Sequence, residues 1–442
     1  MLERPRELGR KIPALASEFH VNARRRQAHG SPPPLPNLIG SSVLARRGRE
    51  ASARRPLVAP GLPLHTRACA PLQRHLAISP AAIAVDTAPI LITGGAGFIG
   101  SALVRHLVLE RGLAVVNVDA LTYAGHRRSV AAAAESPRYA FERADIADAA
   151  QVEAIFRRHR PRAVIHLAAE SHVDRSIDWP APFVHTNVIG TFTLLEQATR
   201  HWQGLADSGR DAFRFVHVST DEVFGALGSE GRFTASSPYR PNSPYAASKA
   251  ASDHFARAWQ HTYGLPVIVT NCSNNYGPYQ YPEKLLPLVV RKALAGEEVP
   301  VFGSGLQVRD WLHVTDHVHG LVAALERGAV GETYLFGGDA ERTNLDLVGL
   351  LCDLVDELAD DRLPGAAPRR TLIRHVTDRP GHDHRYAIDA SPTTKSLGWQ
   401  AQVSLLDGLR ETVAWYLAHA DWCEHVLAGR YDGGRLGQGI AA

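Results

Sequence analysis

Tyr245 and Lys249 are the two residues whose types and spacing first suggest chemistry. They stand four positions apart at the start of a helical pattern, so both side chains should project from one helix face. A tyrosine with its ordinary pKa of about 10 is a poor base at neutral pH. A lysine ammonium one turn away favours the phenolate and lowers that pKa. The pair is therefore suited to take a proton from a hydroxyl group that is to lose a hydride, and Lys249 could also hold a nicotinamide ribose.

Ser219, Thr220, Asp221 and Glu222 follow an apolar run, 213–218, that predicts a strand. The hydroxyl groups supply a partner for Tyr245. Two adjacent carboxyl groups near one site disfavour simultaneous ionisation, which helps to keep one of them protonated. Without Tyr245 and Lys249 the acidic pair would be more simply explained as a solvated loop.

A glycine-rich turn stands between an apolar run at 90–92 and a helical pattern at 98–108. Its glycines fit the dinucleotide-binding fingerprint in two ways: Gly95, Gly97 and Gly100, or, with one more residue in the first interval, Gly94, Gly97 and Gly100. Glycine allows a tight turn, close approach of a pyrophosphate and close packing of helix on strand. The first turn of the helix would then offer free N–H groups to the phosphates.

A second apolar run, 114–118, ends at Asp119, which lies 19 positions after Gly100. A carboxylate about 20 residues beyond the fingerprint accepts hydrogen bonds from the adenosine ribose. It also repels a 2′-phosphate, so the sequence predicts NAD rather than NADP.

Apolar runs and helical patterns alternate along residues 89–270. The predicted strands are 139–142, 163–167, 213–218 and 267–270, and the predicted helices are 152–159, 183–200 and 245–263. This alternation predicts an α/β fold, a Rossmann-type doubly wound parallel sheet, with chemistry at the strand C-termini. Loops rich in Pro and Gly from residue 271 predict a smaller C-terminal substrate-binding lobe.

The domain prediction follows from these patterns. Residues 89–270 form the NAD-binding Rossmann domain, and 271–432 mainly form the lobe, with some segments returning to the Rossmann domain. Residues 433–442 are a tail. Residues 1–88 carry 14 basic and 5 acidic residues, a balance of +9, while the whole chain carries +3. We interpret 1–88 as a disordered extension, or as a segment that the native protein lacks, rather than a transit peptide or nucleic-acid arm.

The composition, with 45% apolar and 21% charged residues among 442, is that of a soluble globular protein. No run of about 18 apolar residues predicts a membrane span. The four cysteines are Cys69, Cys272, Cys352 and Cys423. They are widely scattered and form neither a disulfide framework nor a metal-binding spacing, so we expect a cytoplasmic protein without a bound metal.

The order of glycine turn, Ser219-Thr220 and the pair Tyr245 and Lys249 resembles the extended short-chain dehydrogenase/reductase superfamily. Five segments, within a likeness that spans about residues 89–432, resemble the dTDP-glucose 4,6-dehydratase family: VSTDEVFG at 218–225, SPYAASK at 243–249, NNYGP at 274–278, RDWL at 309–312 and DRPGHD at 378–383. Phe224 stands where this family usually has tyrosine, and we expect it to pack.

The resemblance implies conversion of dTDP-glucose to dTDP-4-keto-6-deoxyglucose and water, by oxidation at C4, elimination across C5–C6 and return of the hydride to C6. It implies that Asp221 is the acid and Glu222 the base, and that Thr220 and Tyr245 hold the C4 oxygen. It also implies a homodimer through a four-helix interface formed by the helices at 183–200 and 245–263.

The resemblance also implies the binding residues. Those for NAD are Gly94, Gly97, Phe98, Ile99, Gly100, Asp119, Ala120, Leu121, Thr122, Asp145, Ile146, Leu167, Ala168, Ala169, Thr186, Tyr245, Lys249 and Asn275. Those for the nucleotide sugar are Ser171, Thr220, Asn274, Lys284, Leu285, Arg309, Asn344, Arg379, His382 and Tyr431. Arg309 and Arg379 suit a pyrophosphate, because guanidinium forks match phosphate oxygens. His166, His172 and the other unmatched histidines are expected to be structural or surface residues.

Two other functions stay open at this point. One is another nucleotide-sugar 4,6-dehydratase or a 4-epimerase on the same fold, and Asp221 and Glu222 argue against the epimerase. The other is a non-catalytic NAD-binding protein that senses redox state, which the presence of both Tyr245 and Lys249 disfavours. A nucleic-acid partner is not expected, because the chain after residue 88 carries a net charge of −6.

Overall fold

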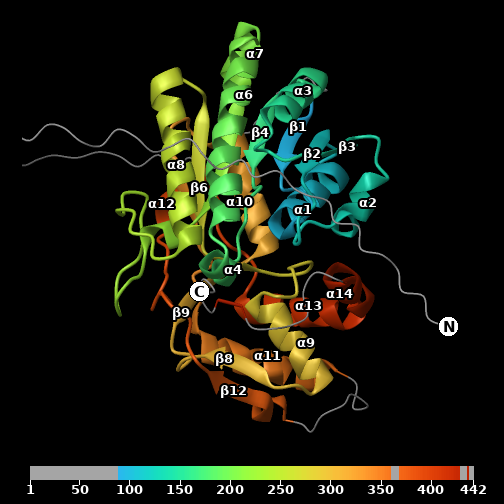
Figure 1. The fold of residues 1–442 in the computed structure, drawn as a ribbon, viewed down its shortest axis with the longest axis vertical. Coiled ribbons are helices and arrows are strands. Elements are labelled where there is room, and N and C mark those ends of the chain that lie inside the picture. The colour runs from blue at the N-terminus through green and yellow to red at the C-terminus, as the bar shows by residue number, and fades with distance from the viewer. Residues whose placement is uncertain (1–87, 360–367, 429–435, 438–442) are drawn as a thin grey trace, which may run out of the picture. The chain divides into compact units, whose positions relative to one another are not determined.

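The computed structural model describes residues 88–359, 368–428 and 436–437 (Figure 1). The predictions made for residues 1–87, for Tyr431 and for most of the tail 433–442 lie outside these ranges.

A seven-stranded parallel sheet forms the centre of the described chain, with the strand order β10-β6-β5-β4-β1-β2-β3. Its strands are β1 (Ile90–Thr93), β2 (Val115–Asp119), β3 (Tyr139–Arg143), β4 (Ala163–His166), β5 (Arg214–Thr220), β6 (Val267–Cys272) and β10 (Thr333–Phe336). The strand order reverses between β1 and β4. Ligands of such sheets bind at this switch point, outside the carboxyl ends of the strands. The predicted fold class is confirmed.

Helices cover both faces of the sheet (Figure 1). Ile90 and Ile92 pack with α1 (Phe98–Arg105) and α10 (Val314–Arg327), and Leu91 packs on the opposite face. The opposite face is covered by α3 (Ala149–His159), α6 (Thr191–Gln203) and α8 (Pro244–Tyr263). Burial on both faces explains why the strands are almost continuously apolar.

Two of the predicted helices contain a π-helical segment. Helix α1 continues as η1 (His106–Glu110), and the helix predicted at 183–200 consists of α5 (Ala181–Phe183), η3 (Val184–Gly190) and α6. Shorter helices join the other elements of this part: η2 (Arg127–Val130), α2 (Ala131–Ala134), α4 (Val173–Asp178), α7 (Asp207–Ala212), η4 (Asp221–Phe224) and α12 (Ser391–Leu397).

The smaller lobe lies at the carboxyl-end side of the sheet, in the lower half of Figure 1. Its strands are β7 (Asn274–Tyr276), β8 (Val299–Phe302), β9 (Val308–His313), β11 (Glu341–Thr343) and β12 (Ile373–Val376), in sheets of order β11-β9-β7 and β12-β8. Its helices are α9 (Leu285–Ala295), α11 (Asn344–Leu358), η5 (Arg369–Leu372), α13 (Leu405–Ala418) and α14 (Ala420–Leu427). Strand β10 and helices α10 and α12 return from this part of the chain to the main sheet and its helices.

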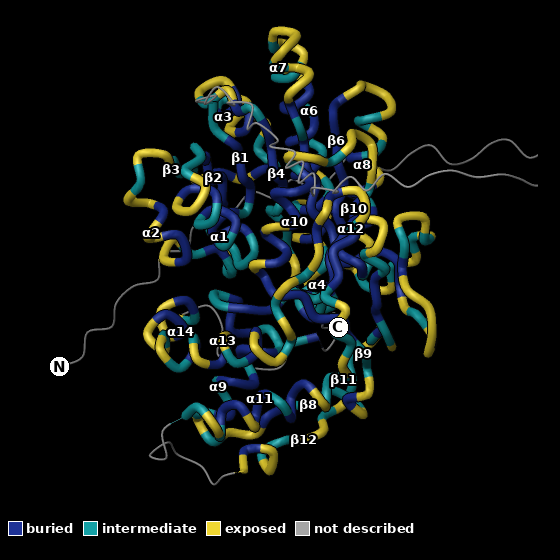
Figure 2. The backbone as a smooth tube through the Cα atoms, turned by 180° about the vertical axis from the view of Figure 1, so that it is seen from behind, coloured by how far each residue is buried: buried dark blue, intermediate teal, exposed yellow. Residues whose placement is uncertain are grey.

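Each of the two parts has its own buried core, drawn dark blue in Figure 2. The lobe core joins α9, α11 and α13 through residues such as Val289, Leu351 and Leu409. Phe224 is buried in a smaller cluster, with ring centroids 5.1 Å from Phe233 and 5.2 Å from Tyr239, so the expected packing role is confirmed.

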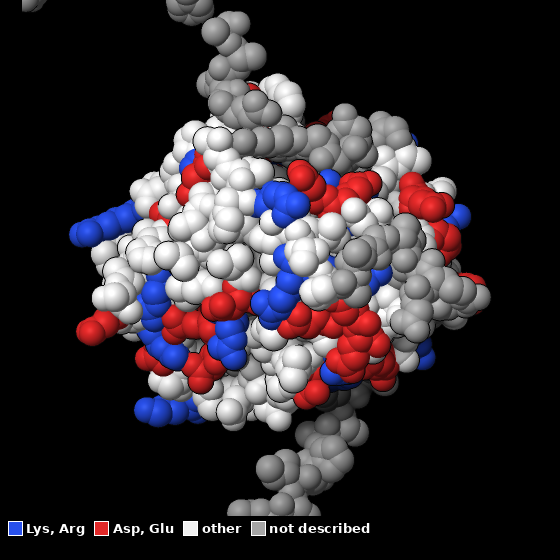
Figure 3. All heavy atoms as spheres, turned by 90° about the horizontal axis from the view of Figure 1, so that it is seen from below, with Lys and Arg blue, Asp and Glu red and all other residues white. Residues whose placement is uncertain are grey.

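Among the described residues, no helix is both long and apolar enough to cross a membrane. On the face shown in Figure 3, Lys and Arg side chains lie among Asp and Glu side chains rather than in a continuous basic patch.

Candidate active site

Two adjoining pockets lie at the carboxyl ends of the central strands. The first, here called the glycine-loop pocket, is lined by the turn after β1 and by the ends of β2, β4 and β5. The second, the lobe pocket, lies mainly between α4 and the lobe strands and helices. The two pockets share Ser171, Glu222, Asn274, Asn275, Gln280, Glu283 and Lys284. A ligand with two chemically different parts could therefore reach from one pocket into the other.

Almost all the residues predicted to hold the cofactor line the glycine-loop pocket. They are Gly94, Gly97, Phe98, Ile99, Gly100, Asp119, Ala120, Thr122, Asp145, Ile146, Leu167, Ala168, Ala169, Thr186, Tyr245, Lys249 and Asn275. Leu121 is predicted as well but lines neither pocket; it has a positive φ of 57°, and its backbone N–H donates to the Asp119 carboxylate. Thr220, Asp221 and Glu222 line the same pocket.

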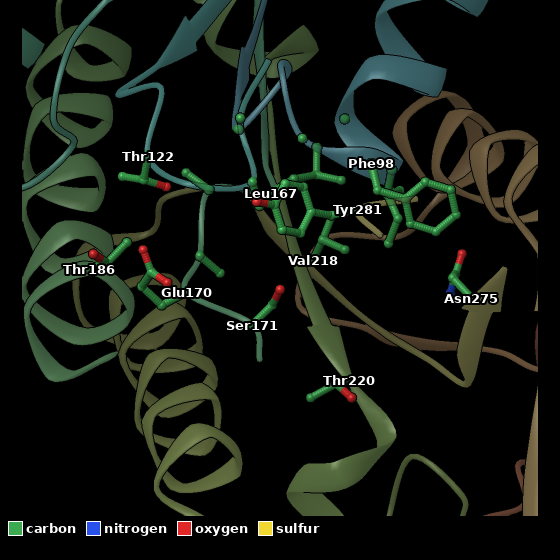
Figure 4. Close-up of a pocket in the computed structure, with 18 of the residues that line it drawn as sticks. Phe98, Thr122, Leu167, Glu170, Ser171, Thr186, Val218, Thr220, Asn275 and Tyr281 are labelled. Carbon is green, nitrogen blue, oxygen red and sulfur yellow. The ribbon is translucent and has the colours of Figure 1, made fainter. Parts of the chain in front are cut away.

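Figure 4 shows how the labelled side chains surround the glycine-loop pocket. Phe98 and Asn275 lie on one side, and Thr186 and Glu170 lie on the other. Thr220 stands at the end of β5, toward the lobe.

The glycine turn is shaped by close backbone approach. Gly94 has a φ of +73°, and a Cβ at this position would lie 2.7 Å from the backbone of Ala168. A Cβ on Gly100 would lie 2.1 Å from the carbonyl oxygen of Gly94. The spacing that begins at Gly94 is therefore the one that makes the turn, and Gly95 is needed separately because its Cβ would meet Asn117. This turn leaves room for a phosphate beside the start of α1, so the residues fit a dinucleotide.

Asp119, the last residue of β2, is held by two backbone N–H groups. Ala96 N donates to Oδ2 at 2.9 Å, and Leu121 N donates to Oδ1 at 2.8 Å. Burial raises the pKa of this carboxyl group, and the two hydrogen bonds oppose that rise. The carboxylate is thus fixed at the edge of the pocket, where the sequence predicted a ribose acceptor.

Asp221 and Glu222 begin the 3₁₀ turn η4 directly after β5. Thr220 caps this turn, since its Oγ1 accepts from Glu222 N at 3.3 Å. Asp221 is buried, and burial together with the charge of Glu222 raises its pKa well above the ordinary value. Burial also raises the pKa of Glu222, but Arg379, Arg309 and Lys284 oppose the rise. Both pKa values are raised overall, and that of Asp221 is raised well above its ordinary value, so Asp221 is the better suited of the two to donate a proton.

Tyr245 and Lys249 lie in the first turns of α8, which starts at Pro244 and is capped by Ser243. Ser243 Oγ accepts from Ala246 N at 3.0 Å. Lys249 is buried, and its Nζ donates to the carbonyl oxygen of Val218 at 3.0 Å. This bond turns the ammonium toward β5, in the wall of the glycine-loop pocket.

The predicted lowering of the Tyr245 pKa is wrong for this arrangement of groups. Burial raises the pKa well above its ordinary value, and the nearby Glu222 and Cys272 add to the rise. A hydrogen bond with Thr220 works in the opposite direction. The prediction counted only the charge of Lys249 and could not include the burial of the phenol.

The lobe pocket gathers the residues predicted to hold the nucleotide sugar. They are Ser171, Asn274, Lys284, Leu285, Arg309, Asn344, Arg379 and His382. Leu285 and Asn344 are the first residues of α9 and α11. Burial and the charge of Arg379 lower the pKa of His382 to about 4 despite its 2.7 Å hydrogen bond with Asp378, so the imidazole is neutral at pH 7.

Three of the cationic side chains that line the lobe pocket also act on Glu222. Lys284 Nζ donates to the carbonyl oxygen of Ser171 at 2.9 Å. Arg309 is buried, donates to the carbonyl oxygen of Asp383 at 3.0 Å and lies 4.2 Å over the Tyr386 ring. Arg379 Nη1 pairs with Asp174 at 2.6 Å. Such a cluster is suited to a diphosphate.

Several residues that line the lobe pocket were not predicted. His172, interpreted from sequence as structural or surface, is buried against the pocket with its Nδ1 unpartnered among the described residues. Asp174, Glu283 and Tyr386 also line it. His172 follows Ser171 and Glu283 precedes Lys284, so their position next to predicted residues could have indicated from the sequence that they line the pocket. By contrast, His166 is structural as expected, because it hydrogen-bonds Thr93 and Thr191 in the core.

Comparisons with known proteins agree with this geometry. The sequence profile of the GDP-mannose 4,6 dehydratase family matches residues 91–412. The chain is 54% identical over 351 residues to the dTDP-glucose 4,6-dehydratase of Neisseria meningitidis serogroup B, covering 79% of this chain and 99% of the relative.

Solved structures are similar as well. The dTDP-glucose 4,6-dehydratase DesIV of Streptomyces venezuelae, crystallised with NAD and TYD bound, has a TM-score of 0.70 and 46% identity, covering 76% of this chain and 99% of that one. The UDP-glucose 4-epimerase of Thermotoga maritima has a TM-score of 0.65 and 31% identity, covering 75% and 99%. The fold is thus shared with epimerases, whereas the higher identity lies with dehydratases. The chain belongs to the nucleotide-sugar 4,6-dehydratases, and within them to the dTDP-glucose 4,6-dehydratase family.

Proposed function

We propose that this chain is an NAD-dependent hydro-lyase that converts dTDP-glucose to dTDP-4-keto-6-deoxyglucose and water. The observation that carries this function is the pair Asp221 and Glu222. The pKa of Asp221 is raised well above its ordinary value, whereas three cations favour the carboxylate of Glu222, and the pair lines the glycine-loop pocket with Tyr245. An elimination needs an acid and a base at one site, and this pair supplies both.

The glycine-loop pocket is the proposed site of NAD. The glycine turn would accept the pyrophosphate and Asp119 the adenosine ribose. Bound there, NAD would supply the acceptor for the hydride of C4 and, once reduced, the donor of the hydride to C6. The reaction therefore needs no added reductant, and the cofactor ends as it began.

Tyr245 is proposed to take the proton of the 4-hydroxyl group, while Thr220 holds the same oxygen. Because burial, Glu222 and Cys272 raise its pKa, Tyr245 can act as this base only where a nearby positive charge favours its phenolate. Lys249 supplies a positive charge in the same wall of the pocket. The positive nicotinamide ring of NAD would supply a second one, and both would favour the Tyr245 phenolate. Once C4 is a ketone, the C5 proton becomes acidic.

Glu222 is proposed to remove the C5 proton, because Arg379, Arg309 and Lys284 favour its ionised form. Asp221, kept protonated by burial and by Glu222, is proposed to give its proton to the departing 6-hydroxyl group. The C–O bond at C6 then breaks with release of water, and a C5–C6 double bond forms. The hydride would return to C6, and Glu222 would give the proton that it removed back to C5, which completes the 4-keto-6-deoxy sugar.

The lobe pocket is the proposed site of the dTDP group. Arg309 and Arg379 would bind the diphosphate, and Lys284 lines the same pocket. This arrangement would place the sugar at the residues that the two pockets share.

We also propose that the protein is a cytoplasmic homodimer. Val184 and Ile189 on η3 and Tyr263 at the end of α8 are about half exposed. Phe192 and Trp259 pack edge to face beside them, with ring centroids 5.7 Å apart. A second copy of this face would cover the exposed apolar surface. The cytoplasm is supported by three free, buried cysteines: Cys272, Cys352 and Cys423.

A 4-epimerase is the second candidate, favoured only by the shared fold. An epimerase returns the hydride to C4 and does not need an acid and a base at C5 and C6, so the adjacent carboxyl groups of Asp221 and Glu222 would then have no role in the reaction.

The test is incubation of the purified protein with dTDP-glucose and no added reductant, followed by mass spectrometry. Loss of one water from the sugar nucleotide is expected. An unchanged mass with conversion to dTDP-galactose would favour the epimerase. Steady accumulation of NADH in step with product would contradict the closed hydride cycle.

A further inference from the structure

One more carboxylate lies buried near the proposed catalytic residues and has no part in the function described so far. Asp253 follows Lys249 by four positions and Tyr245 by eight on α8, so the three side chains share a helix face. It is completely buried and lines neither pocket. A buried carboxylate needs hydrogen bonds or a counter-charge, since burial without them is costly.

The carboxylate of Asp253 receives three hydrogen bonds from separate parts of the fold. His217 on β5 pairs with Oδ1 at 2.9 Å through its Nε2. Tyr239, in the segment before α8, donates its hydroxyl to Oδ2 at 2.7 Å. Asn271 on β6 donates to Oδ2 at 3.3 Å and also to the carbonyl oxygen of Thr220 at 3.0 Å. Asp253 therefore ties α8 to both strands that flank the proposed site.

The surroundings keep Asp253 ionised. Burial by itself raises the pKa of Asp253, but the His217 hydrogen bond, the charge of Lys249 and the Tyr239 hydrogen bond leave the pKa lowered overall. Burial lowers the pKa of His217 to about 4, so its imidazole is neutral at pH 7. The neighbouring His166 on β4 is kept neutral by burial in the same way.

The remaining charged groups around Asp253 are cations on its own helix. Arg257 donates to the Tyr239 hydroxyl at 2.8 Å, and Lys249 stands one turn before Asp253. Burial lowers the pKa of Lys249, and Asp253 is the leading influence that opposes this change, with Cys272 after it. Within the described residues, the only hydrogen bond of the Lys249 ammonium runs to the Val218 carbonyl. An ammonium so buried keeps its proton best beside a fixed negative charge.

We propose that Asp253 is a positioning residue of the proposed reaction, which keeps Lys249 charged behind Tyr245 and, through Asn271, fixes the backbone at Thr220. This role rests on the proposed function, because Asp253 would act on the reaction only through Tyr245, Lys249 and Thr220. Asp253 does not touch the pockets and acts only through these groups.

The test compares wild-type protein with Asp253→Asn in rapid mixing with dTDP-glucose across pH 6–10. The reading is the near-ultraviolet absorbance of reduced cofactor, which reports oxidation at C4. Wild type should lose rate at high pH where Lys249 loses its proton. Removing the negative charge of Asp253 lowers the Lys249 pKa. The fall in rate at high pH, here called the alkaline limb of the pH profile, should therefore move to lower pH by about 1 unit or more.

Tyr239→Phe is the matched control, because it removes one hydrogen bond to Asp253 and keeps the carboxylate. Its alkaline limb should stay at the wild-type pH even if its rate falls. Bound NAD and the thermal midpoint are measured for each variant. Where Asp253→Asn lacks NAD or cooperative melting, Asp253→Ser, which is smaller and also uncharged, is measured in its place.

Each outcome decides between the two proposals. A folded, NAD-containing uncharged variant whose rate falls by the same factor at every pH overturns the role of Asp253 and leaves the proposed function intact. A wild-type protein that neither reduces its bound cofactor nor dehydrates the substrate overturns the proposed function, and the role of Asp253 with it.

Discussion

Asp174 in α4 pairs with Arg379 across 205 positions of sequence, with 2.6 Å between Oδ1 and Nη1. The pair holds one edge of a guanidinium whose Nε is buried and unpartnered among the described residues. The pair thus orients Arg379 in the lobe pocket and leaves its Nε–H available for an anion, so the planar shape of the guanidinium matters as well as its charge.

Arg379→Lys is therefore expected to raise the KM for dTDP-glucose tenfold or more, with a smaller effect on kcat. Lysine keeps the charge but loses the planar fork that matches a diphosphate. Steady-state kinetics at fixed salt measure both constants. Arg232→Lys, in an exposed pair with Asp339, is the control and should leave KM unchanged. Equal KM values for Arg379→Lys and wild type would remove Arg379 from the diphosphate site.

Glu222→Gln should separate the two halves of the reaction. The substitution preserves size and removes the base, so oxidation at C4 should survive while proton removal from C5 should not. Near-ultraviolet absorbance of reduced cofactor should rise on addition of dTDP-glucose, and product release should fall by about 100- to 10,000-fold. Tyr245→Phe should instead prevent the absorbance rise. Turnover of Glu222→Gln within about threefold of wild type would exclude Glu222 as the base.

Asp221→Asn should stabilise the protein at neutral and alkaline pH while lowering its turnover. The folded-state pKa of Asp221 is raised above its unfolded value, so ionisation favours unfolding once the pH exceeds the ordinary Asp pKa of about 4. The gain in thermal midpoint should be largest at pH 8 and vanish near pH 4, within the range in which the wild type melts reversibly. Asp253→Asn should show the opposite sign at pH 8, because the pKa of Asp253 is lowered. A pH-independent change at Asp221 would contradict this ionisation state.

Ile189→Asp should convert the proposed dimer to monomer. Ile189 is 45% exposed on η3, within the apolar face beside α8, and an interface cannot bury a carboxylate there without a partner. Light scattering at micromolar concentration measures the mass. Leu406→Asp, at a similarly exposed position of α13, should leave the mass unchanged. A wild type that is already monomeric would overturn the dimer.

The sheet could be predicted from sequence because its pattern is local. Apolar runs such as 163–167 are long enough to be strands, and the glycine turn and Asp119 have fixed spacing along the chain. The predicted strands and helices accordingly differ from the observed ones mainly at their ends. The π-helical segment at Val184–Gly190 was not predicted, because its residues have the same apolar spacing as an α-helix.

What the sequence could not supply depends on contacts between distant residues. The pKa of Tyr245 is governed by burial, which a motif does not encode. The pairing of Asp174 with Arg379 joins two segments that no local pattern connects. Sequence also predicted that segments would return to the main sheet without showing that Thr333–Phe336 is the edge strand.

That returning strand has a consequence for how the protein is made. Strand β6 pairs with β10 through partners such as Val269 and Thr333. During synthesis, one edge of β6 therefore stays unpaired until the chain between the two strands has emerged from the ribosome. At about 5–20 residues per second this interval lasts several seconds. An apolar strand with an open edge is a template for pairing with other chains during that time. Slower translation between the two strands should therefore lower the soluble yield, although it leaves the finished fold unchanged.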